Sequence, residues 1–115
     1  MKILKETKNG RLFKCSSCSN YHLEFNNINL NFSEARLQSF KKYLMNLDGF
    51  EFEIQNSQSS FKRKIVIQTN TTGLNILLNQ SELEELKCLL DYRKSKKKEF
   101  DWASYESLFV EMNLN

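Results

Sequence analysis

The sequence predicts an α+β fold, in which a meandering antiparallel sheet of about six or seven strands carries two helices on one face and a third helix follows at the carboxyl end. Three features give this prediction. Apolar and polar residues alternate in several short segments, as in half-buried strands. Two longer segments repeat their leucines at helical spacing, each after a residue that favours the start of a helix. The pattern of the first half also recurs in the second.

Length and composition set the domain organisation. The chain has 115 residues, of which 40% are hydrophobic and 27% charged, as in an ordinary globular protein. We expect residues 1–92 to form a single α+β domain and residues 93–115 to form a basic linker and a C-terminal helix.

Composition also narrows the class of protein. The net charge of +3 is too mild to demand an acidic partner, and no apolar run approaches the roughly 18 residues of a membrane span. Charges interrupt the amino terminus too early for a signal peptide, which favours the cytoplasm, and an odd number of cysteines argues against a disulfide framework. The glycines fall at expected turns, so no Gly-rich nucleotide loop remains, and we expect a protein without enzymatic activity.

Two hairpins open the chain. Strands are predicted near Lys2–Thr7 and Arg11–Lys14, with Asn9-Gly10 as a type I′ turn that needs positive φ. The next two, Tyr21–Phe25 and Ile28–Phe32, alternate strictly around a two-residue turn. That turn length places Phe25 opposite Ile28 and makes one side of the hairpin apolar.

The first helix begins after Ser33, a suitable N-cap, and ends at Gly49. Its inward face is predicted to hold Leu37, Phe40, Tyr43, Leu44 and Leu47.

Two more strands are predicted at Phe50–Gln55 and Phe61–Gln68, because apolar residues again alternate there. A turn between them would pair Glu53 with Lys62 and Glu51 with Lys64 across the strands.

A last strand, Leu74–Asn79, leads into the second helix, which Asn79 or Ser81 could cap. Its inward residues are Leu83, Leu86, Leu89 and Leu90. Residues 28–44 and 74–90 then match in order, which fits a duplicated strand–strand–helix unit. The alternative is that any two such units of similar length would match this well.

The tail combines a basic run with an aromatic stripe. Asp101 is a suitable cap for a third helix after the basic linker. One face of that helix carries Trp102, Tyr105, Phe109 and Met112. We expect this face to pack on the polar side of the sheet, on a second subunit or on a protein partner.

The two cysteines of Cys15-Ser-Ser-Cys18 form the strongest chemical signal. Thiolates at this spacing can meet at one tetrahedral ion such as Zn²⁺, and His22 is the natural third ligand. The helical pattern places Cys88 toward solvent, so it is a poor fourth ligand, and a water, a carboxylate or a second subunit would close the site. The alternative is a pair of plain cytosolic thiols in a tight turn.

Two other functions are weaker alternatives. A nucleic-acid-associated regulator would use Arg93, Lys94, Lys96, Lys97 and Lys98. An RNA-binding sheet would expose aromatic rings, whereas Tyr21, Phe25 and Phe32 are predicted on the core face, so nucleic acid is not favoured. A thiol oxidoreductase is least favoured, because Cys18 leads into a strand and no helix start lowers the thiol pKa.

The stretch from Asn9 to Ser33 reads N-G-x4-C-x2-C-x3-H-L-x-F-x-N-x2-L-x-F-S, and a later stretch begins Ser81-Glu-Leu-Glu-Glu-Leu. Over roughly residues 9–92 these motifs resemble a small bacterial family classed only as a domain of unknown function. The resemblance implies no activity. It implies a glycine in the hairpin turn where this chain has Asn26, which also accepts positive φ.

Overall fold

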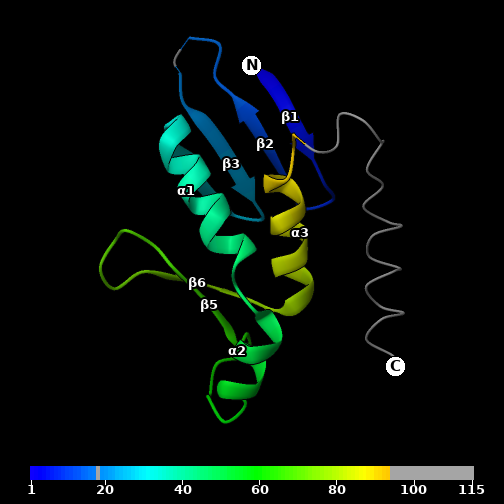
Figure 1. Ribbon diagram of the computed structural model, residues 1–115, viewed down its shortest axis with the longest axis vertical. Helices are drawn as coiled ribbons and strands as arrows, with labels where there is room; N and C mark the ends of the chain where they lie inside the picture. The colour runs from blue at the N-terminus through cyan, green and yellow to red at the C-terminus, as the bar shows by residue number, and fades with distance from the viewer. Residues whose placement is uncertain (18, 94–115) are drawn as a thin grey trace.

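The computed structural model describes residues 1–17 and 19–93, and these form two antiparallel sheets and three helices. In chain order the elements are β1 (Lys2–Glu6), β2 (Gly10–Lys14), β3 (Tyr21–Phe25), β4 (Ile28–Phe32), α1 (Glu34–Met45), α2 (Gly49–Gln55), β5 (Ile65–Gln68), β6 (Asn75–Leu78) and α3 (Gln80–Leu90). Figure 1 shows α1 and α3 beside the larger sheet, with α2 and the β5–β6 hairpin at the end away from the amino terminus.

The larger sheet is a meander in the order β1-β2-β3-β4. Its β3–β4 register is as predicted, with Phe25 opposite Ile28 and Leu23 opposite Leu30. Asn26 has a φ of 53°, so asparagine supplies the left-handed conformation that this tight turn requires.

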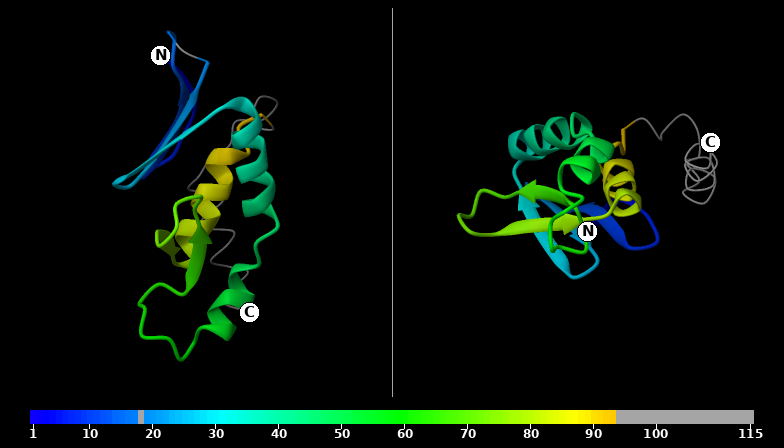
Figure 2. Two further views of the ribbon diagram at one scale, coloured as in Figure 1. Left: turned by 90° about the vertical axis from the view of Figure 1, so that its left-hand side faces the viewer. Right: turned by 90° about the horizontal axis from the view of Figure 1, so that it is seen from below.

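Helices α1 and α3 cover one face of this sheet, as the sequence predicted (Figure 2). Tyr21, Leu23 and Phe25 of β3 are buried under them, together with Leu12 of β2. The predicted inward leucines of α3 are all buried, and Leu37 and Leu44 of α1 are fully buried. Ser33 caps α1, and Asn79 caps α3 in a capping box with Glu82.

The β1–β2 turn differs from the prediction. The two residues at its tip are Lys8 and Asn9, because the Thr7 N–H donates to the Gly10 carbonyl at 2.9 Å. Neither Asn9 nor Gly10 has positive φ, so the expected type I′ turn at Asn9-Gly10 is wrong. Glycine is needed at position 10 for space: a Cβ there would lie 2.6 Å from the Glu24 carbonyl oxygen and 2.8 Å from Leu89.

The Glu85 carboxylate fastens this turn to α3. Glu85 is 3% exposed and accepts from the Thr7 hydroxyl at 2.6 Å, the Asn9 N–H at 2.8 Å and the Asn9 side-chain amide at 2.8 Å. The Asn9 carbonyl in turn accepts from the Asn26 N–H at 2.8 Å. A single buried carboxylate therefore connects the helix layer to both hairpin turns.

The segment predicted as a strand at Phe50–Gln55 is the helix α2. Asp48 is its N-cap, with its side chain accepting from the Glu51 N–H at 3.1 Å. Phe50 and Ile54 are 50% and 70% exposed, so their alternation does not mark a buried strand face. The Asp48-x-x-Glu51 spacing is the helix-start signal that the alternation obscured.

A single sheet of six or seven strands is also wrong for the described residues, whose six strands divide into sheets of four and two. The strand predicted from Phe61 begins only at Ile65, and Phe61 is 55% exposed.

The cross-strand pairs Glu53–Lys62 and Glu51–Lys64 are not formed, because their acidic residues lie in a helix. The ammonium group of Lys64 instead donates to the carbonyl oxygens of Ser59 and Phe61.

The two halves of the chain keep the predicted order of a hairpin followed by a capped helix. Leu37 and Leu44 of α1 correspond to Leu83 and Leu90 of α3, and all four are fully buried. The halves differ in their hairpins, since β3–β4 has a two-residue turn whereas residues 69–74 separate β5 from β6. Duplication of one unit stays a hypothesis.

We expect Glu85→Ala to lower the free energy of unfolding by about 2–4 kcal/mol, because it leaves the donors of Thr7 and Asn9 buried without an acceptor. Urea denaturation followed by circular dichroism measures this loss. Glu53→Ala is the matched control, because Glu53 is half-buried in α2 and should change stability by no more than about 0.5 kcal/mol. Equal losses in both variants would show that Glu85 does not connect the layers.

Candidate functional site

The Cys15–Asn20 loop joins β2 to β3 and holds the cysteine pair. It is closed by a backbone hydrogen bond of 3.2 Å from the Cys15 N–H to the Asn20 carbonyl. The Cys15 thiol is half-buried and lies 3.3 Å from the Ser17 hydroxyl. Cys18 falls outside the described residues, so the position of the second predicted ligand is not described.

His22 lies on the face of the sheet opposite the helices, as predicted. It pairs with Phe13 of β2, and the two rings are 5.1 Å apart at their centroids. Cys15 follows two residues after Phe13 and therefore lies on the same face, diagonally next to His22. The strand pairing thus brings together two of the three predicted ligands.

Asn31 of β4 holds the imidazole from the other side. Its side-chain oxygen lies 2.5 Å from His22 Nδ1, and the two residues are directly opposite in the β3–β4 ladder. This contact raises the pKa of His22 above its ordinary value, an effect that Cys15 reinforces and burial partly offsets. Because Asn31 engages Nδ1, a metal ion bound by this imidazole would take Nε2.

No group of three His, Cys, Asp or Glu side chains within residues 1–17 and 19–93 is arranged to hold a metal ion. A site at this position therefore depends on Cys18, or on a ligand from outside the described chain.

Phe13 is a residue of this face that the sequence analysis missed. The Arg11 guanidinium lies over its ring at 5.1 Å and also pairs with Glu24 at 2.6 Å. The alternation of Arg11, Phe13 and Cys15 with buried Leu12 was the available signal, because it places all three on the outer face. The open face of the sheet therefore carries an aromatic side chain that the sequence analysis did not place, while Tyr21, Phe25 and Phe32 lie on the core side as predicted.

Cys88 is buried, at 6% exposure, so its predicted exposure to solvent is wrong. The reason is the position of α3, which contacts β1, β2, β6, α1 and α2 and has no broad solvent face. Burial raises the pKa of the Cys88 thiol to about 11. A neutral buried thiol is a packing residue and a poor metal ligand.

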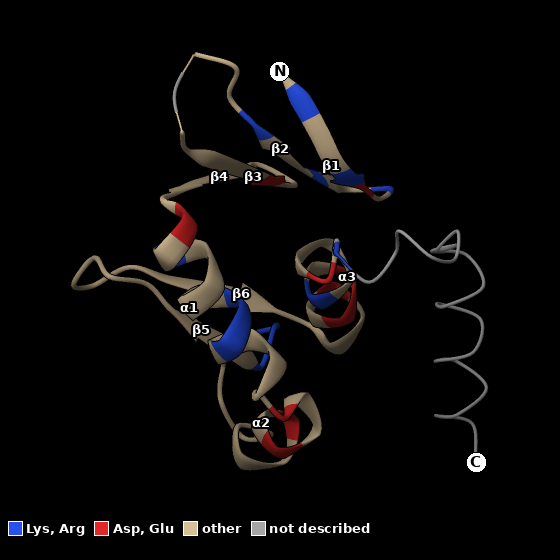
Figure 3. Ribbon diagram, turned by 45° about the horizontal axis from the view of Figure 1, so that its top comes forward, with Lys and Arg blue, Asp and Glu red and all other residues tan. Residues whose placement is uncertain are grey.

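The basic run that an alternative function would use is mostly outside the described residues, since only Arg93 precedes residue 94. Its guanidinium pairs with Glu34 at 2.8 Å and lies 5.5 Å from the Tyr92 ring centroid. Figure 3 shows Lys and Arg interspersed with Asp and Glu over the described elements. In the Lys62–Lys64 run, Arg63 pairs with Glu82 at 2.7 Å. This distribution does not favour a nucleic-acid surface.

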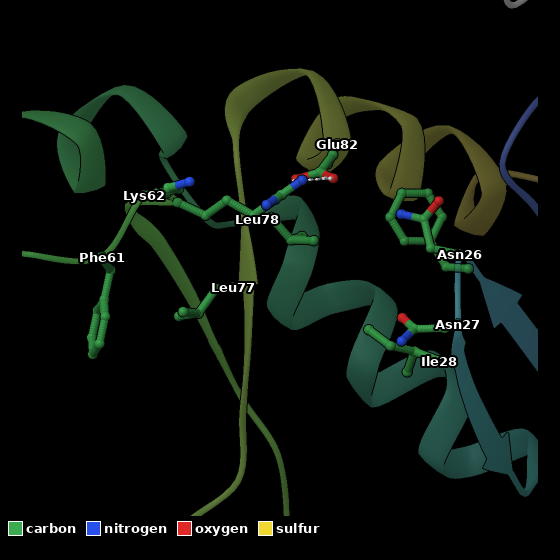
Figure 4. A pocket seen from close by; sticks show the side chains of 10 residues that line it. Asn26, Asn27, Ile28, Phe61, Lys62, Leu77, Leu78 and Glu82 are labelled. Carbon is green, nitrogen blue, oxygen red and sulfur yellow. Dashed lines mark hydrogen bonds and ion pairs between the residues drawn. The ribbon is translucent and has the colours of Figure 1, made fainter.

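Two hollows lie between the larger sheet and the β5–β6 hairpin. One, of about 550 Å³, is bordered by the β3–β4 turn, Leu77 and the Arg63–Glu82 pair (Figure 4). The other, of about 520 Å³, lies between β4, α1 and the loop after β5. The predicted interface residues Trp102, Tyr105, Phe109 and Met112 lie outside the described residues.

The whole chain, residues 1–115, matches a family of unknown function, DUF6686, and the protein belongs to this family. Searches of curated proteins and of solved structures find no match. Within the described part of the chain, the helices lack the length and apolar character needed to cross a membrane.

We expect the stability of the protein to fall relative to Cys88→Ala as the pH rises from about 9 to about 11. The thiol loses its proton near pH 8.5 in the unfolded chain but only near pH 11 when buried, so alkali favours unfolding. Denaturant titrations at pH values of about 8, 10 and 11, which span the two pKa values, measure the free energy of unfolding of both proteins. The other titrating groups contribute equally to both and cancel in the difference. A difference that stays constant with pH would contradict a buried, neutral thiol.

Proposed function

We propose that this protein is a non-enzymatic binding protein that holds one metal ion, Zn²⁺ by its chemistry, at Cys15, Cys18 and His22. The observation that carries the proposal is the position of Cys15 and His22 side by side on the open face of the sheet, which the pairing of Phe13 with His22 sets. Two soft or borderline ligands already lie together there, and the loop between them contains a second cysteine.

The surroundings of His22 support a ligand role. Metal-binding histidines usually engage their second ring nitrogen in a hydrogen bond, which fixes the orientation of the ring. Asn31 makes such a contact at 2.5 Å, and the Phe13 ring packs against the imidazole. The imidazole is therefore held in one orientation before any ion binds.

The position of the cysteine loop favours a metal site with a structural or binding role over redox catalysis. Cys15 directly follows a strand, and the described elements place no helix start beside it. A dithiol with a catalytic potential usually gains its low pKa from a helix amino terminus. Free thiols require a reducing compartment, so the proposal keeps the cytoplasmic location expected from the sequence.

Protein purified without chelator is expected to carry one Zn²⁺ per chain, as counted by native mass spectrometry. Cys15→Ser and Cys18→Ser should abolish binding, because each removes a thiolate. Asn31→Ala should weaken the affinity by roughly tenfold to a hundredfold, as the loss of a residue that orients a ligand does.

Two variants serve as controls. Asn29→Ala removes the same side chain from the same face of β4, two pairs further along, and should leave the affinity unchanged. Cys88→Ser removes the buried thiol and should also retain the metal. The proposal fails if the purified protein takes up no Zn²⁺ or Co²⁺, or if Cys15→Ser binds as the parent does.

A further inference from the structure

β4 leaves one edge of the larger sheet unpaired. It pairs with β3, and no other strand of the described residues pairs with its outer side. Phe25 and Ile28 flank a two-residue turn and therefore exchange backbone hydrogen bonds. Such pairs alternate along an antiparallel ladder, so the N–H and C=O groups of Asn29 and Asn31 point away from β3. Within residues 1–17 and 19–93, these backbone groups have no hydrogen-bond partner.

The opposite edge of this sheet is protected against further pairing. β1 carries Lys2, Lys5 and Glu6, and a bulge interrupts its ladder between Ile3 and Lys5. Charges and bulges are the usual features that keep an edge strand from pairing with another chain. β4, by contrast, has an unbroken ladder and contains neither a charged residue nor a proline. Of the two edges, β4 is the one suited to receive a further strand.

The two hollows between the larger sheet and the β5–β6 hairpin leave room for a strand beside β4, and we call them together the β4–β6 groove. Ile28 borders the hollow of about 550 Å³, and residues 30–32 border the hollow of about 520 Å³. The groove therefore reaches from the first residue of β4 to its last. On the other side β6 borders both hollows, through Leu77 and Ile76 respectively (Figure 4). An extended segment as long as β4, roughly 17 Å for its five residues, matches this length.

The walls of the groove favour a single extended segment over a second copy of the sheet. If the β4 strands of two copies paired, each copy would bring its own β5–β6 hairpin to the contact. The hairpin of one copy would then take the space that the sheet of the other needs, because it lies across the groove from β4. A peptide that supplies one strand brings no such neighbour.

The floor of the groove sets the side chains that the segment needs. The stacked rings of Phe32 and Phe40 lie there, with their centroids 5.1 Å apart, and Leu74 at the rim is 55% exposed. A strand added to β4 would turn every second side chain toward these apolar groups. The segment should therefore alternate apolar and polar residues, as β4 itself does.

Both hollows of the groove carry a positive charge. Exposed Arg36 borders one and exposed Lys62 the other, and neither makes an ion pair within the part of the chain that the structure describes. Among the described residues that border the groove, the one carboxylate belongs to Glu82, which already pairs with Arg63 at 2.7 Å. A segment with an acidic residue near each end would complement this charge.

We propose that the β4–β6 groove binds an extended acidic peptide segment of another protein, which adds a strand to the free edge of β4. Its backbone pairs with the outward N–H and C=O groups of Asn29 and Asn31. Its alternate apolar side chains pack on the aromatic floor, and its acidic residues pair with Arg36 and Lys62. This binding does not depend on the metal proposed above.

The probes are fluorescein-labelled peptides of the pattern Glu-X-Thr-X-Thr-X-Glu, in which X is Val, Ile, Phe or Tyr. We expect members of this set to bind the full-length protein in anisotropy titrations. Methylating every backbone nitrogen of the best binder should weaken its binding by about tenfold or more, because the side chains remain but the backbone donors are lost. Arg36→Glu should weaken the binding by about two- to fivefold, the effect of an exposed ion pair. Lys42→Glu makes the same charge change on α1 outside the groove and should have no effect.

Asn29→Pro tests the edge of β4 itself. Proline removes an N–H that the β3–β4 ladder does not use, so the fold should persist while peptide affinity falls by roughly tenfold. Asn29→Ala keeps the N–H and should bind the peptide as the parent does. Hydrogen exchange followed by NMR gives a second measurement. The N–H groups of Asn29 and Asn31 should exchange faster than that of Leu30 in the free protein and should become protected by the peptide.

The proposal is overturned if no peptide of the set binds at concentrations up to about 1 mM. Equal affinities for the methylated and unmethylated peptides, or for Asn29→Pro and Asn29→Ala, would also contradict it, as would unchanged exchange at Asn29 and Asn31. A dimer mass in light scattering that Asn29→Pro reduces to a monomer would assign the β4 edge to a second copy instead.

Discussion

The buried carboxylate of Glu85 is the interaction on which the arrangement of the layers depends. Burying a charge is costly unless hydrogen bonds replace the lost water, and here Thr7 and Asn9 supply three of them. These contacts fix the β1–β2 turn against α3, and the link from Asn9 to Asn26 extends the constraint to the β3–β4 turn. Apolar packing alone would let the sheet slide over the helices, whereas directional bonds define one position.

This constraint explains why α3 is buried on nearly every side. One side of the helix carries Glu85 and Leu89 toward the β1–β2 turn, while the other contacts α1 and α2. Gly10 permits the close approach, since any side chain there would strike a backbone carbonyl. With α3 held in this position, the β5–β6 hairpin that leads into it forms a sheet of its own, and grooves remain between the two sheets.

The sequence predicted the elements whose signals are local. Ser33 and Asn79 cap the helices as expected, and strict alternation gave the β3–β4 register. Prediction from the sequence failed where a tertiary contact decides whether a side chain is buried. Nothing local marks Glu85 as buried, because its partners lie more than 70 residues away. Cys88 was misplaced for the same reason, since a helical wheel assumes one solvent face and α3 lacks one. At Phe50–Gln55, by contrast, a local cap at Asp48 was present and was overlooked.

Asn31 connects the proposed metal site to the edge of the larger sheet. Its side chain engages His22 on the open face of the sheet, and the same residue borders the groove beside β4. β4 is an edge strand, so Asn31 is reached both from the face and from the edge. The orientation of the imidazole therefore depends on a side chain at the edge of the sheet, which supports the predicted ligand without being a ligand itself.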